Sequence, residues 1–357
     1  MSARCAKASV VRHLDFSVRR FSARALLLLA GVGALMLAQA ASAVAAGPKP
    51  DKRGLWVPNA GGNTIVEFTS TQRAASGSPV PTLTNTSSAL GFPTALVFDP
   101  SGNMWVVDEA TPAIDEFSSK QLKQLGTVGD PTPAVTITSS VFSNPLADFD
   151  RNGNLWVSDD AANKIYEFSH KQLKAGGDLT PAVTITSADL NGARNLAFDG
   201  KGNLWISNDG SDQIEEFAKK GLAKGGALTA AVILSDDGSG SISVCKGIAF
   251  DRKHNLWVAN LGNSTVVEFP ASALKATGSP TPAVTIGASG GSLNAPVGLG
   301  FDKKGNLWAS NFGNDTVVEF SPAQIAASGT PTPVVTISAT AGSLVGPEQF
   351  SFGPSIK

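Results

Sequence analysis

One short motif, Gly-Asn-Leu-Trp, constrains this chain more than any other feature of its sequence. Three copies carry Trp156, Trp205 and Trp308, and three variants of the motif carry Trp56, Trp105 and Trp257. These six tryptophans are all that the chain contains, and about 50 residues separate one from the next. Such a period is typical of proteins built from repeated supersecondary units, so a ring or row of similar modules is expected.

Each repeat predicts four short strands separated by turn residues. In the third copy the expected strands cover residues 144–149, 154–158, 164–168 and 180–185. Asp-x-x-Gly-Asn forms the first turn, where aspartate can bond the backbone and glycine can take a positive φ. In the fifth copy His254 holds the glycine position, and we interpret it as a turn residue rather than a catalytic one. Residues 118–122, 169–173 and 321–325 predict single helical turns after the third strand.

The strand that carries each tryptophan is apolar on consecutive residues, which indicates burial on both faces. A Glu-Phe pair follows every tryptophan at the same distance, at Glu67, Glu116, Glu167, Glu216, Glu268 and Glu319. Blades packed face to face around an axis satisfy both patterns. The first copy begins at its second strand, and residues 347–352 match the first strand that it lacks. The predicted fold is therefore an all-β, six-bladed β-propeller with four antiparallel strands per blade, closed by the C-terminal strand joining blade 1.

The N-terminal segment has the features of a signal peptide. Four arginines between positions 12 and 24 precede an apolar run at residues 25–40, and Ala41-Ser42-Ala43 offers small residues for cleavage. We predict a signal peptide at residues 1–46, a propeller domain at residues 47–357, and a secreted or periplasmic location after bacterial-type export. The alternative is an uncleaved anchor, although the run is short for a span of about 20 residues. Cleavage would leave Cys245 as the single cysteine, without an intramolecular disulfide.

The charge of the mature part argues against two classes of partner. Residues 1–46 hold six of the 28 basic residues and one of the 29 acidic ones, so the remainder has 22 basic and 28 acidic residues, a net charge of −6. Nucleic acids and anionic membranes require clustered Lys and Arg. We therefore expect neither as a partner once the signal peptide is removed, and we expect a monomer.

The motif Phe-Asp-x-x-Gly-Asn-Leu-Trp-Val-x-Asn, followed by Asn-x-Val-x-Glu-Phe, resembles the NHL repeat over about residues 54–352. It is more distantly similar to the lactonase-like propellers of the SMP-30/gluconolactonase group and to streptogramin B lyases. The resemblance implies a six-bladed propeller. It does not imply one activity, because the shared residues are those that build the blades.

In propellers of this kind, ligands bind where the innermost strands begin. By that analogy two acids and two bases converge on the central channel of this chain. With two neighbouring amides they form the candidate ligand-binding set: Asp148, Arg194, Asn195, Lys246, Glu348 and Gln349. One interpretation is a polar ligand site in which the two bases hold an anionic group. The alternative is an internal ion-pair network that neutralises the channel.

The enzymatic families fit less well at these positions. The lactonase resemblance implies a metal held by asparagines at the inner strand starts, where this chain has residues such as Arg194 and Lys246. The lyase resemblance implies a histidine base, whereas the mature chain has only His170 and His254, both expected away from the ligand face. We therefore predict no metal or cofactor and assign no catalytic residue.

Two function hypotheses remain open. The first is a binding or scaffold module for a protein or a small polar, anionic ligand. The alternative is a hydrolase or lyase in which Asp148 or Glu348 is the base for a small polar substrate in the channel.

A second ring of polar residues stands three positions after each tryptophan: Asn59, Asp108, Asp159, Asn208, Asn260 and Asn311. Such a ring could suggest calcium. Because it occurs in every copy, we interpret it as structural, with each side chain bonding its own turn. Glu109, Asp160 and Asp209 follow it in some copies and could add an acidic rim, although we interpret them as ordinary solvated turn charges.

Overall fold

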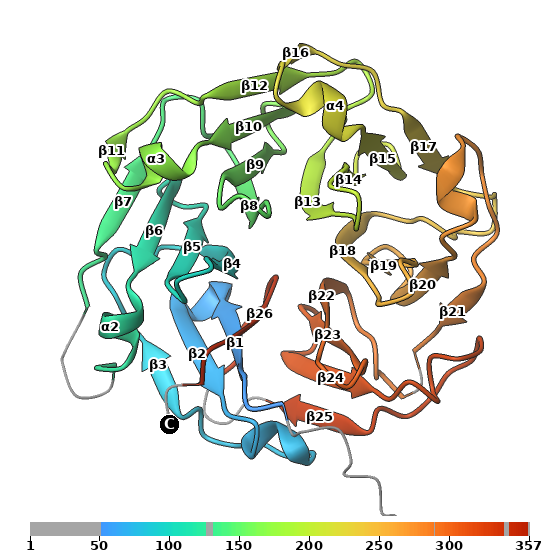
Figure 1. Cartoon of the computed structure of the whole chain (residues 1–357). Helices are drawn as coiled ribbons and strands as arrows, with labels where there is room; N and C mark the ends of the chain where they lie inside the picture. The colour runs from blue at the N-terminus through green and yellow to red at the C-terminus, as the bar shows by residue number, and fades with distance from the viewer. Residues whose placement is uncertain (1–50, 126–130, 289, 339–342, 356–357) are drawn as a thin grey trace, which may run out of the picture. The chain divides into compact units, whose positions relative to one another are not determined.

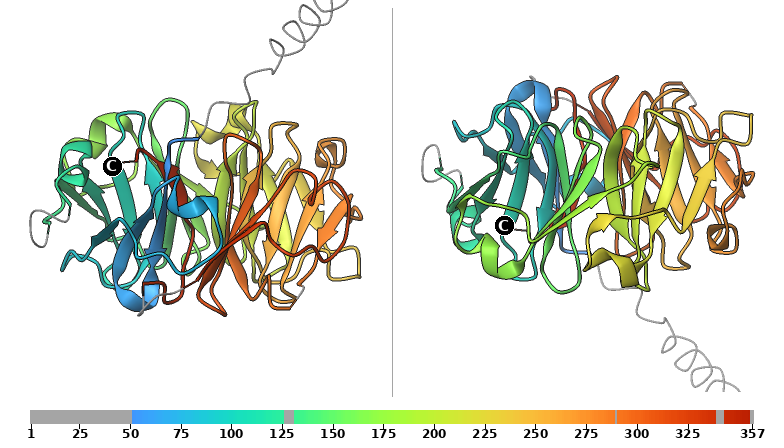
Figure 2. Two further views of the ribbon diagram at one scale, coloured as in Figure 1. Left: turned by 90° about the horizontal axis from the view of Figure 1, so that it is seen from below. Right: turned by 90° about the horizontal axis from the view of Figure 1, so that it is seen from above.

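The computed structural model describes residues 51–125, 131–288, 290–338 and 343–355. Their strands form six sheets around a central axis, one sheet for each sequence repeat (Figure 1). Seen from the side, the sheets stand next to one another as the blades of a ring (Figure 2). The predicted six-bladed β-propeller is confirmed.

Each blade is an antiparallel meander, with its first strand at the axis and its last at the rim. From the axis outward, the strands are β26 (Ser351–Gly353), β1 (Gly54–Asn59), β2 (Thr64–Phe68) and β3 (Leu83–Asn85) in blade 1; β4 (Pro93–Phe98), β5 (Met104–Asp108), β6 (Ala113–Phe117) and β7 (Val135–Thr138) in blade 2; β8 (Pro145–Phe149), β9 (Leu155–Asp159), β10 (Lys164–Phe168) and β12 (Val183–Thr186) in blade 3; β13 (Ala193–Phe198), β14 (Leu204–Asn208), β15 (Gln213–Phe217) and β17 (Val232–Ser235) in blade 4; β18 (Cys245–Phe250), β19 (Leu256–Asn260), β20 (Thr265–Phe269) and β21 (Val284–Ile286) in blade 5; and β22 (Pro296–Phe301), β23 (Leu307–Asn311), β24 (Thr316–Phe320) and β25 (Val335–Ser338) in blade 6.

Two of the three expected helical turns are present. They are α2 (Ser119–Leu122) and α3 (His170–Leu173), each begun by a serine whose side chain forms a capping box with a glutamine. Residues 321–325 instead form a turn that Ser321 and Ile325 close with one backbone hydrogen bond. Four further short helices were not expected: α4 (Lys219–Leu222), η2 (Gln72–Ala74) and η3 (Ala273–Lys275) follow the third strand of their blades, and η1 (Ala60–Gly62) follows β1.

The antiparallel order gives the ring two distinct faces. The upper face carries the turns between second and third strands, together with the loops that lead from one blade to the next. The lower face carries the Asp-x-x-Gly-Asn turns and the short helices that follow the third strands. His254 has φ 64° in its lower turn and donates its N–H to the carbonyl of Asp251, so it is the turn residue that was predicted.

Tryptophans hold the blades together. Each one packs edge-to-face against the phenylalanine that ends the first strand of the next blade, with ring centroids 5.9–6.1 Å apart. Trp156, for example, is 3% exposed and lies 6.0 Å from Phe198. The strand that carries it is buried along its whole length, as the consecutive apolar residues predicted.

The ring closes as the sequence predicted. β26 pairs antiparallel with β1 and so becomes the innermost strand of blade 1. Further up the same edge, Asn59 and Pro347 form an isolated bridge. The sixth tryptophan contact, from Trp308 to Phe352, spans this closure, so the first and last parts of the chain share one junction.

The outer edges are covered in a way that the sequence did not predict. Two sheets carry a fifth, two-residue strand, β11 (Gly177–Asp178) on blade 2 and β16 (Gly226–Ala227) on blade 3, which runs parallel to the edge strand. Each comes from the loop that follows the third strand of the next blade. Isolated parallel bridges from Gly77, Gly278 and Gly329 do the same for blades 6, 4 and 5. Backbone groups that would otherwise form open edges are thereby paired.

The N-terminal segment lies outside the described residues, and the predicted signal peptide with it. Within the part of the chain that is described, no helix has both the length and the hydrophobicity that a membrane crossing requires.

Replacing one tryptophan should weaken one junction of the ring. We expect Trp156→Ala to lower the free energy of unfolding by about 3–5 kcal/mol, because a large side chain is removed from a packed interface. Thermal unfolding measures the change, and Phe312→Ala, at a side chain that is 41% exposed, is the control. Equal melting temperatures for the two variants would contradict the packing role.

Candidate functional site

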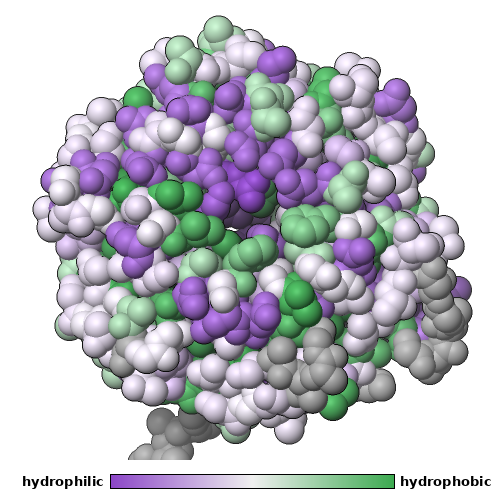
Figure 3. All heavy atoms as spheres, turned by 180° about the vertical axis from the view of Figure 1, so that it is seen from behind, coloured by the Kyte–Doolittle hydropathy of each residue, from purple (hydrophilic) through white to green (hydrophobic). Residues whose placement is uncertain are grey.

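Polar side chains gather where the axial channel opens on the upper face. Arg194 and Lys246 are the second residues of β13 and β18, so both stand at the start of inner strands of neighbouring blades. Aspartates from the turns between second and third strands reach the same place. We define the upper mouth by six residues: Glu109, Asp160, Arg194, Asp209, Lys246 and Glu348. Figure 3 looks onto this face and shows hydrophilic residues gathered on one side of the central hollow.

The two bases of the upper mouth are held by aspartates. Arg194 Nη1 lies 3.3 Å from Asp160 Oδ2, and Arg194 Nε lies 4.0 Å from Asp209 Oδ2. Lys246 Nζ pairs with the same oxygen of Asp209. These ion pairs connect blades 3, 4 and 5 in sequence. Asp160 and Asp209 therefore form an acidic rim of ion-pair partners at the mouth, rather than ordinary solvated turn charges.

Glu348 lies at the opposite side of the same opening, on the inner edge of blade 1. Its side chain is largely buried, with 9% of the residue exposed. Burial raises the pKa of Glu348 to about 7, although Arg194 and Lys246 both act to lower it. A carboxylic acid with this pKa exchanges its proton near neutral pH.

Asp148 lies apart from the other three charged candidates. It lines a cavity of about 360 Å³ inside the channel, together with inner-strand residues and Arg53. Its Oδ1 accepts a hydrogen bond of 2.8 Å from the N–H of Phe149, and burial raises its pKa to about 7. Neither Arg194 nor Lys246 contributes to this shift. Arg194, Lys246 and Glu348 do not line this cavity, whereas the candidate amides Asn195 and Gln349 do, so Asp148 occupies a different part of the channel from the upper mouth.

The two candidate amides connect inner strands to one another. Asn195 Oδ1 accepts from the N–H of Ile248 in the next blade, at 3.1 Å. Gln349 bonds Leu299 of blade 6 in both directions, accepting at 3.3 Å and donating at 3.2 Å. These hydrogen bonds use some of the donor and acceptor atoms of each amide. Asn195 and Gln349 thereby connect the neighbouring inner segments that form the channel wall.

Hydrophobic side chains occupy another part of the upper rim. Phe312 and Val345 are 41% and 38% exposed, and they come from blade 6 and from the loop before β26. Leu261 of blade 5 holds the same turn position as Asp160, Asp209 and Phe312. Sequence reasoning missed this contrast, which is visible when the residue following each ring asparagine or aspartate is compared across copies. Figure 3 shows hydrophobic surface beside the central hollow, next to the hydrophilic side.

The ring of asparagines and aspartates is structural, as predicted, but its bonds extend beyond the local turn. Asp159 accepts from the N–H of Ala162 in its own turn and from Ser143 and Asn144 in the loop before β8. Asn260 bonds Ser243 and Ser241 in the loop before β18 in the same way. Each member therefore attaches the loop that enters a blade to the second strand of that blade.

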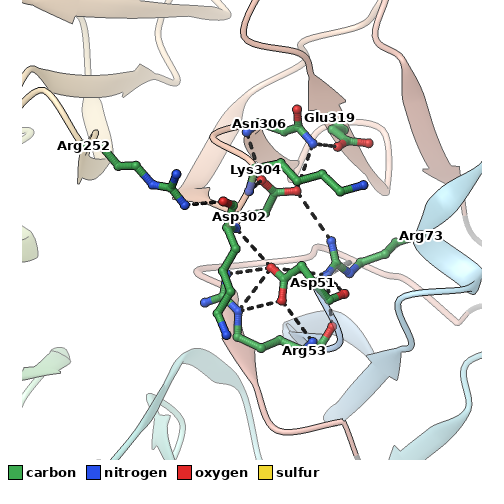
Figure 4. A network of polar contacts seen from close by, with 9 residues as sticks. Asp51, Arg53, Arg73, Arg252, Asp302, Lys304, Asn306 and Glu319 are labelled. Atoms are coloured by element: carbon green, nitrogen blue, oxygen red, sulfur yellow. Dashed lines mark hydrogen bonds and ion pairs between the residues drawn. The ribbon is translucent and has the colours of Figure 1, made fainter. Parts of the chain in front are cut away.

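A second polar cluster lies on the lower face, at the junction of blades 6 and 1 (Figure 4). Arg73, which is 6% exposed, lies 3.5 Å from Asp51 and 3.8 Å from Asp302 and donates to the carbonyls of Asp51 and Arg53. Its guanidinium also stands over the rings of Trp308 and Phe352. The sequence analysis did not identify this cluster.

Within residues 51–125, 131–288, 290–338 and 343–355, no three His, Cys, Asp or Glu side chains are grouped closely enough to hold a metal ion. His170 and His254 both lie on the lower face, away from the upper mouth.

Comparison with known proteins gives the fold. No protein-family model matches the chain, and no curated protein matches its sequence. Among solved structures, a chain of the nidogen/laminin complex is 14% identical, with a TM-score of 0.60 over 84% of this chain and 98% of that one. A protein of unknown function from Bacteroides caccae is 13% identical, with a TM-score of 0.56 over the same shares. A streptogramin B lyase is 17% identical, with a TM-score of 0.45 over 68% of this chain and 70% of that one. Identities this low indicate a shared β-propeller and nothing narrower.

Asp148 should make stability depend on pH. Its pKa is raised in the folded state, so the folded protein binds the proton more tightly than the unfolded chain. The resulting stability is full below the unfolded pKa and is lost as pH rises through about 7. We expect Asp148→Asn to be more stable than the wild type by about 1–2 kcal/mol at pH 8 and equal to it at pH 4. Denaturant unfolding at both pH values measures this, with the exposed Asp178→Asn as control; a gain at pH 4 alone would contradict it.

Proposed function

We propose that this chain is an exported propeller of the NHL type that acts as a binding or scaffold module. Its ligand is a small polar molecule or a protein segment that places an anionic group at the upper mouth. The observation that carries the proposal is the pair of cations, Arg194 and Lys246, side by side at the start of adjacent inner strands. Their side chains are 14% and 17% exposed, so both remain accessible from the channel opening.

The ion pairs of the mouth support ligand binding as well as structure. Asp160 and Asp209 hold the two cations in one orientation, which lowers the entropy that a ligand must overcome to engage them. An incoming carboxylate can form a bidentate contact with Arg194. Hydrophobic residues on the rim, Phe312 and Val345, supply apolar contact area next to the charges. A neighbouring fold solved in the nidogen/laminin complex supports the use of such a propeller in protein binding.

The NHL assignment and export belong to the same proposal. The repeat motif covers all six blades, and the turn residues that recur in it make the turn and loop hydrogen bonds described above. A signal peptide at residues 1–46 would deliver the propeller, as a monomer, to the periplasm or the medium. Mass measurement of the exported protein would show a mature N-terminus near residue 47; a protein that retains residue 1 would contradict this part.

Binding can be tested with defined small anions. We expect citrate and malonate to raise the melting temperature of the mature protein, while the neutral sugar glucose does not. Arg194→Gln and Lys246→Gln should each weaken citrate binding by about tenfold, since each removes one charge-assisted hydrogen bond. Lys219→Gln, on the lower face, is the matched control. Citrate binding that survives both mouth substitutions would contradict the site.

One observation favours a second candidate, a hydrolase or lyase. Glu348 has a pKa of about 7 beside two cations, which suits a general base that works near neutral pH. Glu348→Gln would then abolish turnover in a panel of lactone substrates while leaving the fold intact. Turnover that persists in Glu348→Gln would remove this candidate, and loss of the fold would identify Glu348 as structural.

A further inference from the structure

Arg73 occupies a position that is hydrophobic in every other blade. It stands five residues after the phenylalanine that ends the third strand of blade 1. The corresponding residues of blades 2 to 6 are Leu122, Leu173, Leu222, Leu274 and Ile325. The local backbone is retained, because Gln72 accepts from the N–H of Thr69 just as Gln121 accepts from Ser118. Arg73 therefore replaces a hydrophobic residue at a position that recurs in every blade. The other five blades show the same position without a guanidinium.

The junction of blades 6 and 1 is filled by this guanidinium. It stands 5.7 Å from the ring centroid of Trp308 and 5.2 Å from that of Phe352, beside the two rings that form the junction. It donates to the carbonyls of Asp51 and Arg53, pairs with Asp51 and with the turn aspartate Asp302, and also lowers the pKa of Glu319 against a larger effect of burial. Of these elements, the aromatic pair and the two carboxylates of Asp302 and Glu319 have counterparts in other blades.

The same elements line open grooves at three consecutive junctions of the lower face. The groove between blades 3 and 4 has a volume of about 280 Å³, that between blades 4 and 5 about 500 Å³, and that between blades 5 and 6 about 320 Å³. Their turn aspartate, tryptophan and glutamate are Asp150, Trp156 and Glu167 in the first, Asp199, Trp205 and Glu216 in the second, and Asp251, Trp257 and Glu268 in the third. Burial raises the pKa of each glutamate, with the neighbouring aspartate as the next cause.

The bonding of the turn aspartate differs between filled and open junctions. In open grooves Asp150 and Asp251 accept hydrogen bonds of 3.3 and 3.4 Å from the indole N–H of Trp156 and Trp257. In the filled junction Asp302 pairs with Arg73, and the indole N–H of Trp308 has no partner among the described residues. The aspartate can therefore exchange a weak neutral donor for a cation.

The groove between blades 4 and 5 already shows an unpaired donor. Trp205 is 1% exposed and lines this groove, yet its indole N–H has no partner within the described residues. Asp199 bonds the backbone and Asn203 of its own turn, as the other turn aspartates do. This groove, the largest of the three, thus resembles the filled junction with its guanidinium removed.

We propose that the three open grooves are binding sites for alkyl-guanidinium groups, such as the side chain of an arginine presented by a peptide. Two carboxylates and an aromatic surface match a flat, weakly hydrated cation with an aliphatic stem. The groove linings also contain cations of this chain: Arg151, Lys201 and Lys219 between blades 3 and 4, Lys201 and Lys275 between blades 4 and 5, and Arg252, Lys253 and Lys304 between blades 5 and 6. Arg252 donates to the carbonyl of Lys303, and the lysines cannot replace a guanidinium, because an ammonium neither stacks flat nor donates in a fork. The site is separate from the upper mouth, so it does not depend on the function proposed there.

Titration of the mature protein with N-acetyl-arginine amide tests the proposal. Because Trp156, Trp205 and Trp257 line the grooves, intrinsic fluorescence should change in a saturable way. The citrulline analogue, which has the same shape without the charge, should bind about tenfold more weakly, and the lysine analogue should also bind more weakly. Agmatine, a free alkyl guanidine, distinguishes recognition of the guanidinium alone from recognition that includes the peptide amides. Equal binding of the arginine and citrulline analogues, or no saturable change with either, would overturn the proposal.

Substitutions that copy Arg73 provide a second test. The triple variant Leu222→Arg, Leu274→Arg, Ile325→Arg should fill all three grooves from within, keep its β-sheet circular dichroism spectrum, and lose the fluorescence response. Glu167→Gln, Glu216→Gln and Glu268→Gln together remove one carboxylate per groove without adding bulk. They should weaken arginine binding by about tenfold, and they keep the test decisive if the arginine variant does not fold. An unchanged response in the glutamine variant would show that the grooves are not the binding sites.

Discussion

The edge-to-face contact between a tryptophan and the phenylalanine of the next blade is the interaction on which the ring depends. It occurs at all six junctions with nearly constant geometry, including the closure between Trp308 and Phe352. The tryptophan lies at a fixed place in the second strand and the phenylalanine ends the first strand, so the contact fixes both the spacing and the register of adjacent blades. The positions of the side chains at the upper mouth and in the lower grooves therefore depend on this repeated Trp–Phe contact.

A repeated framework makes departures from the repeat informative. Residues that recur in every blade build turns, junctions and loop attachments, and they are satisfied locally. Arg73 stands where the other five blades have Leu or Ile, and Arg194, Lys246 and Glu348 share one repeat position at which the other three blades have Thr94, Pro145 and Val297. Charges at these positions cost desolvation that an uncharged residue would avoid. The upper mouth thus carries cations that most blades lack, whereas the carboxylates beside aromatic rings on the lower face belong to the repeat itself.

The repeat predicted the fold because each strand, turn and closure residue acts through local periodicity. It also placed Arg194, Lys246 and Glu348 at one opening. It could not pair them correctly, because Asp160 and Asp209 reach the mouth from turns whose height relative to the inner strands depends on blade tilt. Asp148 was grouped with these residues because the sequence shows its position along the strand but not its depth in the central channel. The lower grooves were not predicted, because each is lined by side chains of two neighbouring blades that are far apart in the sequence.

The covering of outer edges has a consequence for how the chain assembles. On blades 2 to 5 the rim strand is paired by a segment that belongs to the next blade along the chain, through residues such as Gly278 on blade 4 and Gly329 on blade 5. During synthesis, the rim strand of the most recently made blade therefore stays unpaired until the next blade has been made. Blade 6 has no successor, and its rim at Ile337 is paired by Gly77, which left the ribosome first. Protection of the last edge and closure of the circle are thus a single event, and a chain interrupted before it would expose one unpaired strand to its neighbours.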